Sequence, residues 1–136
     1  DPPGGTYWQT LQDFIQNHLL RNKLISPEDL SLYRLTDNVQ EAVDEVLRFF
    51  RVYHSMRYVK QTLVLRLSEP LHPLLLDQIN AEFRDILVDG EFSLTSALPA
   101  ERDEPDLLHL SRLAFHFNRR SLGRLRQLID VVNGGE

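Results

Sequence analysis

The sequence contains no cysteine among its 136 residues, which excludes a disulfide framework, a thiolate-ligated zinc site and a cysteine nucleophile. It also lacks any apolar run near the roughly 20 residues that cross a bilayer, and no signal-peptide pattern is present. Basic residues are in the minority, because 15 Lys and Arg stand against 20 Asp and Glu, a net charge of −5. This balance argues against a nucleic-acid-binding surface. We therefore expect a cytoplasmic protein with no membrane and no nucleic-acid partner.

The composition is that of a folded globular chain. Hydrophobic residues make up 42% and charged residues 26%, which is too apolar for a disordered protein. A chain of this length can bury a core without disulfide or metal staples. It fits one compact domain, or the end of one domain joined to a second small one. Because Met56 is the only methionine, we expect the sequence to be a fragment.

The first part of the chain predicts alternating helices and one strand. Apolar residues at helical spacing predict a helix over residues 7–22 and a second one over residues 36–58. Between them, Ser26 and Pro27 have the residue types of a helix N-cap and first helical position, which predicts one or two helical turns. Residues 31–35 are a strand candidate. This order suggests a parallel α/β unit, since parallel strands need a long crossover.

The second part predicts a strand–helix–strand–strand–helix order. Alternating leucines predict a strand over residues 62–67, and a helix should run over residues 73–88. Strands are then expected near residues 92–98 and within residues 107–117, followed by a helix from Ser121 that Gly134 and Gly135 end. This run resembles a small split α/β sandwich, similar to part of a ferredoxin-like fold. The predicted fold class is α/β and α+β, with domains at residues 1–60 and 61–136 and a boundary near residues 58–61.

Two basic groups are candidate contact sites for a ligand or a subunit. Arg119, Arg120 and Arg124 crowd the start of the final helix, where the helix dipole disfavours cations. They could serve a phosphate, a carboxylate ligand or a subunit, or they could pair with the acidic loop 101–106. His54 and Arg57 continue the apolar stripe of the predicted helix 36–58. They indicate either an anion or subunit contact, or a helix end that leaves the core.

The remaining motifs do not amount to an active site. The glycine-containing turn at residues 3–6 is too short for a standard phosphate-binding fingerprint. His109 and His116 have no third ligand of suitable spacing, so we expect no metal site. No serine, histidine and acid arrangement is suggested by spacing. From the residues alone we therefore assign no catalytic residue.

A family resemblance covers residues 5 to about 50. The residues that carry it are Gly5-Thr6-Tyr7-Trp8, then Leu24-Ile25-Ser26-Pro27-Glu28-Asp29, and then Leu32 to Leu35 with Thr36-Asp37-Asn38 and Glu41-Ala42-Val43. This stretch resembles the C-terminal part of the Rossmann-like family of the LONELY GUY cytokinin-activating phosphoribohydrolases, often labelled lysine decarboxylase-like. The resemblance implies that the stretch is the last helix–strand–helix of a nucleotide-binding domain. The remaining residues look like the extra C-terminal domain of the longer members.

The family's catalytic motif is Pro-Gly-Gly-x-Gly-Thr-x-x-Glu, with an arginine further upstream. Residues 3–6 depart from it, because the second x-Gly is missing and Gln9 stands three positions after Thr6. Aligning residues 7–27 with the family instead places Gly4 and Gly5 at a later strand-end loop. The resemblance then implies that the catalytic residues lie N-terminal to residue 1, and none is carried over.

Two hypotheses follow. In the first, the chain is the C-terminal segment of a protein that hydrolyses a nucleoside 5′-monophosphate to base and ribose phosphate, forms a homodimer and needs no cofactor. In the second, it is a non-enzymatic α+β module that binds a small anionic effector or a subunit through Arg119, Arg120 and Arg124. A strand exposed near residues 31–35 would favour the first, and a closed sheet would favour the second.

Overall fold

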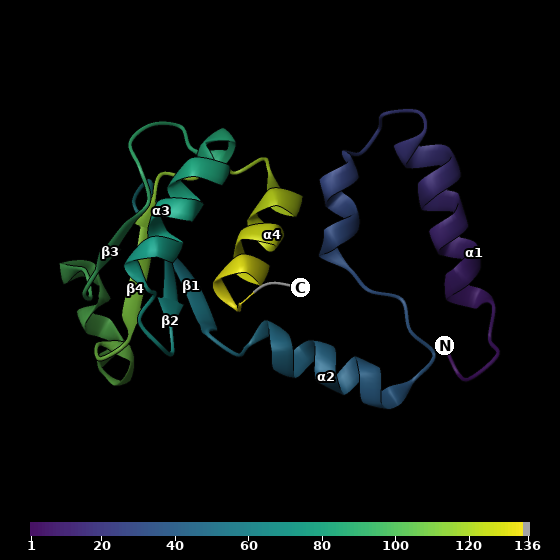
Figure 1. Cartoon of the computed structure of the whole chain (residues 1–136), viewed down its shortest axis with the longest axis horizontal. Coiled ribbons are helices and arrows are strands. Elements are labelled where there is room, and N and C mark those ends of the chain that lie inside the picture. The colour runs from purple at the N-terminus through teal and green to yellow at the C-terminus, as the bar shows by residue number, and fades with distance from the viewer. Residues whose placement is uncertain (135–136) are drawn as a thin grey trace.

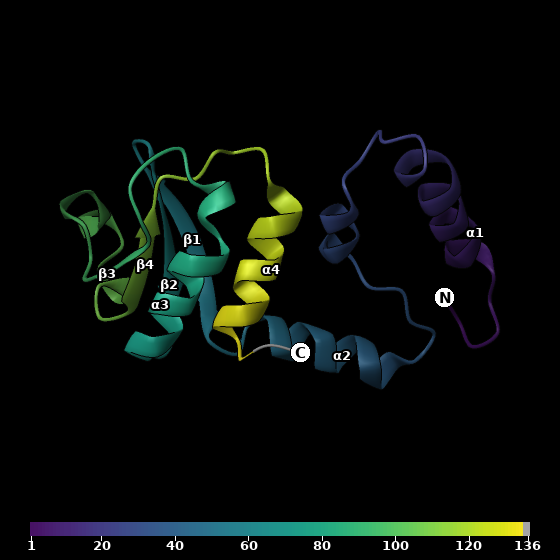
Figure 2. The same cartoon turned by 45° about the horizontal axis from the view of Figure 1, so that its top comes forward.

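The computed structural model describes residues 1–134, and its fold is mixed α/β with a four-stranded antiparallel sheet. Strand β1 (Tyr53–Val59) forms a hairpin with β2 (Thr62–Leu67). On its other side β2 pairs with β4 (Ser111–Phe115), and the short β3 (Ser93–Thr95) pairs with β4 at the far edge. Helices α3 (Pro73–Glu82) and α4 (Leu122–Val132) lie on one face of this sheet (Figures 1 and 2).

The hydrophobic core lies between the sheet and these two helices. Because strand side chains alternate between faces, Leu63, Leu65 and Leu67 of β2 all point to the helix layer, and each is fully buried. They meet fully buried Ile79 of α3 and Leu128 of α4 in one continuous cluster. The other face of the sheet is covered by a loop with two 3₁₀ turns, Pro99–Asp103 and Pro105–Leu107. We call residues 98–107 the acidic loop from here on.

The element predictions for the second half of the chain are largely confirmed. β2 occupies the predicted range, β3 and β4 lie within their ranges, and α4 follows Ser121. The helix expected over residues 73–88 ends earlier, at Glu82, and a single 3₁₀ turn follows. Gly134 has a φ of 100° at the end of α4, the left-handed conformation that favours glycine. Gly135, also expected there, lies outside the described residues.

The first half of the chain extends away from the sheet (Figure 1). It consists of α1 (Tyr7–Phe14), continued by a π-helical segment over Ile15–Leu20, then a 3₁₀ helix over Pro27–Leu32, and α2 (Val39–Phe49). The 3₁₀ helix has the predicted Ser26 cap, since the Ser26 N–H donates to Asp29 Oδ2 at 2.9 Å. It packs closely on α4, where a Cβ added to Gly123 would lie 2.3 Å from the Glu28 carbonyl.

Two element predictions in this half are wrong. Residues 31–35 do not form a strand: the 3₁₀ helix reaches Leu32, and the following residues are extended but pair with no strand among residues 1–134. The helix expected to reach residue 58 ends at Phe49, because β1 begins at Tyr53. Asn133 fixes this change of structure. Its Oδ1 accepts from the N–H groups of Val52 and Tyr53, and its Nδ2 donates to the Phe49 carbonyl.

The predicted boundary at residues 58–61 falls inside the β1–β2 hairpin. His54 and Arg57 are consequently strand residues and not helix residues. No helix within residues 1–134 is both long and apolar enough to cross a membrane.

Candidate functional site

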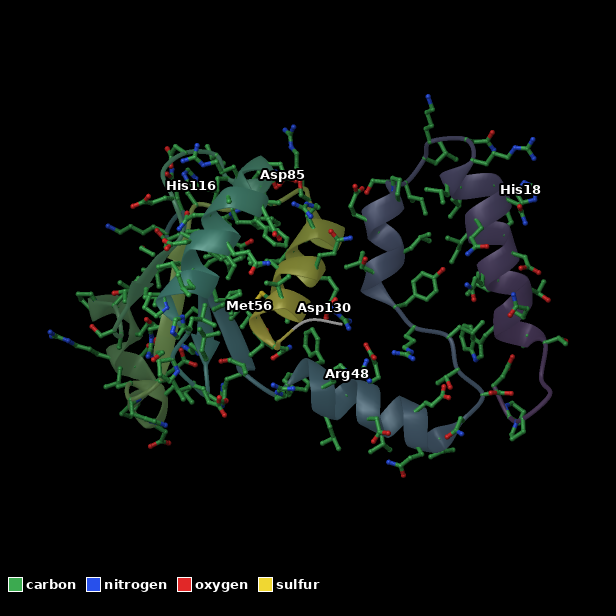
Figure 3. All side chains as sticks on the ribbon, in the orientation of Figure 1. His18, Arg48, Met56, Asp85, His116 and Asp130 are labelled. Atoms are coloured by element: carbon green, nitrogen blue, oxygen red, sulfur yellow. The ribbon has the colours of Figure 1, made fainter. Side chains whose placement is uncertain are left out.

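The basic residues predicted at the start of α4 do not form one cluster. Arg124 is held by Asp85, whose two carboxylate oxygens each accept a hydrogen bond of 2.9 Å from it. Its guanidinium also lies 4.3 Å from the centre of the Phe83 ring. The hydrogen bond from Arg124 lowers the pKa of Asp85, although partial burial acts to raise it. Arg124 therefore joins α4 to the end of α3 (Figure 3, where Asp85 is labelled).

The other two arginines point elsewhere. Arg119 donates to the carbonyl of Lys60 at 3.1 Å, and its guanidinium lies 4.2 Å from the centre of the Tyr58 ring. Arg120 has no side-chain hydrogen bond or ion pair within residues 1–134. It lines an open polar cleft of about 550 Å³ between α4 and the 3₁₀ helix, together with Lys23 and Glu28. Within residues 1–134 none of these arginines pairs with residues 101–106, because Glu101, Asp103 and Glu104 bind other arginines, while pairing with that loop of a neighbouring chain stays a prediction.

The partner of the acidic loop is a set of three arginines on the sheet, Arg57, Arg66 and Arg112. Arg57, a predicted contact residue, donates to Asp103 and to Glu104, each at 2.6 Å. His54, predicted beside it, contacts only the adjacent Ser55 hydroxyl, at 2.9 Å. The two residues therefore have different surroundings, because Arg57 binds the acidic loop and His54 is exposed.

Glu101 is the centre of this network. It is fully buried, and its two oxygens accept from the Nε atoms of Arg66 and Arg112, both at 3.0 Å. Arg112 is fully buried as well, and it donates further to the carbonyls of Leu107, Leu108 and Leu110. No buried side-chain polar atom within residues 1–134 lacks a partner. The network is therefore satisfied by the chain itself and offers no free charge to a ligand.

The electrostatics agree with this structural role. Burial acts to raise the pKa of Glu101, but hydrogen bonds from the Leu98 N–H and from both arginines outweigh it and lower the pKa. The pKa of Glu104 is lowered by hydrogen bonds with Arg66 and then with Arg57. All three loop acids (Glu101, Asp103 and Glu104) therefore stay ionised at neutral pH. They hold the acidic loop against the sheet.

Sequence reasoning missed Arg66 and Arg112, although a signal was present. Each occupies the strand position that alternates away from the leucines of the core. A charged residue on the face of a strand opposite to the core normally faces solvent. It is buried here because the acidic loop, with Glu101 in its first 3₁₀ turn, covers that face of the sheet.

The largest unexplained surface lies on the first half of the chain. No residue of the segment 1–51 is buried, although its helices carry regular apolar stripes. Val39 of α2 is 80% exposed and Tyr7 of α1 is 73% exposed. The other exposed members are Trp8, Leu11, Phe14, Val43, Val46, Leu47 and Phe50. Exposed apolar surface on this scale marks an interaction site.

A groove of about 410 Å³ lies within this surface. It is lined mainly by Trp8, Leu11 and Ile15 of the first helix and by residues 33–36. Tyr33 has extended backbone angles, φ −144° and ψ 161°. Among residues 1–134, the N–H and C=O groups of residues 33–35 have no backbone partner outside the preceding helical turn. An unpaired extended segment beside an apolar groove offers backbone groups to which another strand can add.

Within residues 1–134, no group of three histidine or acidic residues could hold a metal ion. His116 contacts Asp89 at 2.8 Å, and His109 takes no part in that pair. A scan against models of known protein families finds no match, and neither a search of curated proteins nor a search of solved structures finds one.

Proposed function

We propose that residues 1–50 complete the nucleotide-binding domain of a LONELY GUY-like protein, and that the protein as a whole hydrolyses a nucleoside 5′-monophosphate. One observation carries this proposal. None of residues 1–51, which include two amphipathic helices and the segment between them, is buried. A helix with a wide apolar stripe gains its stability by packing that stripe against another layer. The helix, extended segment and helix have the order that the sequence resemblance implies.

The missing layer in this proposal is a parallel sheet. Residues 33–35 supply its last strand, and the apolar faces of α1 and α2 cover it on either side. Arg34 and Arg126 both bind Glu45 of α2, at 3.1 and 2.6 Å, which ties α2 to the extended segment and to α4. The extended segment is thereby held ready for a neighbouring strand.

In the same proposal, residues 52–134 form an accessory domain with a ferredoxin-like arrangement. β2 and β3 both pair antiparallel with β4, which lies between them, and α3 connects them. The central part of a ferredoxin-like sheet has this order. β1 then occupies the remaining edge beside β2. The catalytic motif and the nucleoside monophosphate site belong to the preceding part of the whole protein, which we expect to be a homodimer.

The test compares this chain with the longer polypeptide that contains it. We expect the longer protein to release free base and ribose 5-phosphate from nucleoside 5′-monophosphates, and the chain alone to release neither. Hydrogen exchange supplies an independent readout, since the amides of residues 33–35 should exchange rapidly in the chain and slowly in the longer protein. Equal exchange in both, or no hydrolysis of any monophosphate, would overturn the proposal.

A second candidate function is that of a non-enzymatic α+β module for effector binding or oligomerisation. It is favoured by the core of residues 52–132, all of whose buried hydrophobic residues come from the second half of the chain. Of the predicted contact residues, Arg120 remains available, while Arg57 and Arg124 are engaged in ion pairs. Replacing Arg120 by glutamate separates the candidates, because only an effector-binding module should then lose affinity for small anions such as phosphate.

A further inference from the structure

The two edge strands of the sheet differ in length. β3 has three residues, and so short an edge strand offers little to a pairing partner. β1 has seven residues, no proline, and no strand on its outer side among residues 1–134. An edge of this length presents alternate N–H and C=O groups as a template for another strand. Its single irregularity lies at the start, between Tyr53 and Ser55.

An apolar strip runs along this open edge. Met56 and Tyr58 pair with Leu65 and Leu63 of β2, so their side chains lie on the face of the sheet that carries α3 and α4. In contrast to their fully buried partners, Met56 is 39% exposed and Tyr58 is 41% exposed. Figure 3 shows Met56 on β1 where α4 lies beside the strand. The helices, together with the Arg119 guanidinium over the Tyr58 ring, thus cover Met56 and Tyr58 only in part.

We infer that β1 is the interface for a second copy of this chain, which adds its own β1 antiparallel across a twofold axis at Met56. Such pairing would join the two sheets into one of eight strands with all four helices on one face. It goes beyond the proposed nucleotide chemistry and does not depend on it, because it uses no residue of segment 1–51.

The charges of β1 are compatible with this register. With Met56 opposite its own copy, Ser55 lies opposite Arg57 and His54 lies opposite Tyr58, so no like charges face each other. A pairing centred on Arg57 would oppose two guanidinium groups, which is destabilising. A pairing centred on Ser55 would put the irregularity of β1 at its middle. Arg57 is further neutralised by its ion pairs with Asp103 and Glu104.

The absence of cysteine allows a direct test by cross-linking. In the proposed register the two copies of residue 56 have Cα atoms about 4.5–5.5 Å apart, a separation that a disulfide can bridge. Met56→Cys should therefore give most of the protein as a covalent dimer under mild oxidation. Ser55→Cys is the matched control, because its copies would lie diagonally at roughly 7–8 Å. Equal yields from the two variants would overturn the inference.

A second measurement does not depend on disulfide formation. Met56→Lys places two like charges at the twofold axis, so sedimentation equilibrium should show a dimer dissociation constant at least tenfold higher. Leu74→Lys, at an exposed apolar position of α3, should leave it unchanged. Both variants are made in a Val43→Asp, Leu47→Asp background, which removes association through α2. A dimer that survives Met56→Lys, or a parent chain that is monomeric throughout, contradicts the inference.

Discussion

At the scale of single residues, Glu101 connects two strands and a loop through one carboxylate. Oε1 accepts from Arg66 and Oε2 from Arg112 and from the Leu98 N–H. A buried ion pair adds little net stability compared with apolar residues, yet breaking one by removing a single partner is costly. The reason is that the remaining charge stays buried without compensation. This asymmetry makes the fold sensitive to loss of the Glu101 carboxylate.

We predict that Glu101→Gln lowers the free energy of unfolding by about 3–5 kcal/mol. The amide keeps the size of the side chain but leaves Arg66 and Arg112 without their shared anion. Urea unfolding followed by circular dichroism measures the change. Glu69→Gln, at an exposed position, is the control and should stay within about 0.5 kcal/mol of the parent. A similar stability for both variants would show that the network is not important to the fold.

The same network predicts acid sensitivity. The pKa of Asp103 is lowered mainly by its hydrogen bond with Arg57, and that of Glu104 by Arg66 and then Arg57. A lowered carboxyl pKa contributes stability above the pKa of the unfolded chain, about 4, and this is lost as the pH falls through the folded value. The free energy of unfolding should therefore drop between about pH 5 and pH 3. Arg57→Gln should make that drop smaller, and an unchanged pH profile would contradict the argument.

At the scale of elements, the 3₁₀ helix and α4 approach each other through Gly123. A Cβ there would lie 2.3 Å from the Glu28 carbonyl and 2.6 Å from the Asp29 nitrogen, both backbone atoms. We predict that Gly123→Ala separates the two elements and costs about 1–3 kcal/mol, although alanine favours a helix more than glycine does. Hydrogen exchange should accelerate in residues 27–32. The half-exposed neighbour Leu122, changed to alanine, should not have this effect.

How far the sequence predicts each element depends on where its partners lie. β2 and α4 could be predicted because their apolar spacing faces a core made by nearby parts of the chain. β1 could not, since His54 and Arg57 continue a helical spacing. Distant partners fix the extended backbone at Val52 and Tyr53, namely the Asn133 side chain just after α4 and the Ser68 N–H, which donates to the Val52 carbonyl. The strand expected at residues 31–35 failed for another reason. A strand needs a neighbour to pair with, and residues 1–134 provide none there.

The prediction of the candidate site residues also depended on where their partners lie in the chain. The sequence identified the acidic loop and Arg57, but it neither paired them nor singled out Arg66 and Arg112, because the pairing is set by the sheet. Arg57, Arg66 and Arg112 converge only after three strands align. Arg124 is an arginine as well, but it lies on α4 and forms an ion pair with Asp85 instead. The sequence therefore shows which residues are charged, whereas the sheet topology determines which of them form ion pairs.

At the scale of the whole molecule, the chain divides into a part that buries its apolar residues and a part that exposes them. Residues 52–132 form a continuous core, whereas α1 and α2 hold their apolar stripes outward. A helix whose apolar stripe is exposed to solvent has only marginal stability by itself. The first half should therefore depend on a partner layer, and the second half should not.

This division gives the last prediction. Val43→Asp with Leu47→Asp places two charges on the exposed face of α2, at side chains 45% and 65% exposed. Because the core does not use these residues, its free energy of unfolding should change by no more than about 0.5 kcal/mol. Binding of a hydrophobic dye should fall, and if the proposed function holds, the longer nucleotide-binding protein should fail to assemble the domain that contains α2. Val88→Asp, equally apolar and exposed but next to the sheet, should leave that assembly intact. If both variants behave alike, the α2 face is ordinary surface and not an interface.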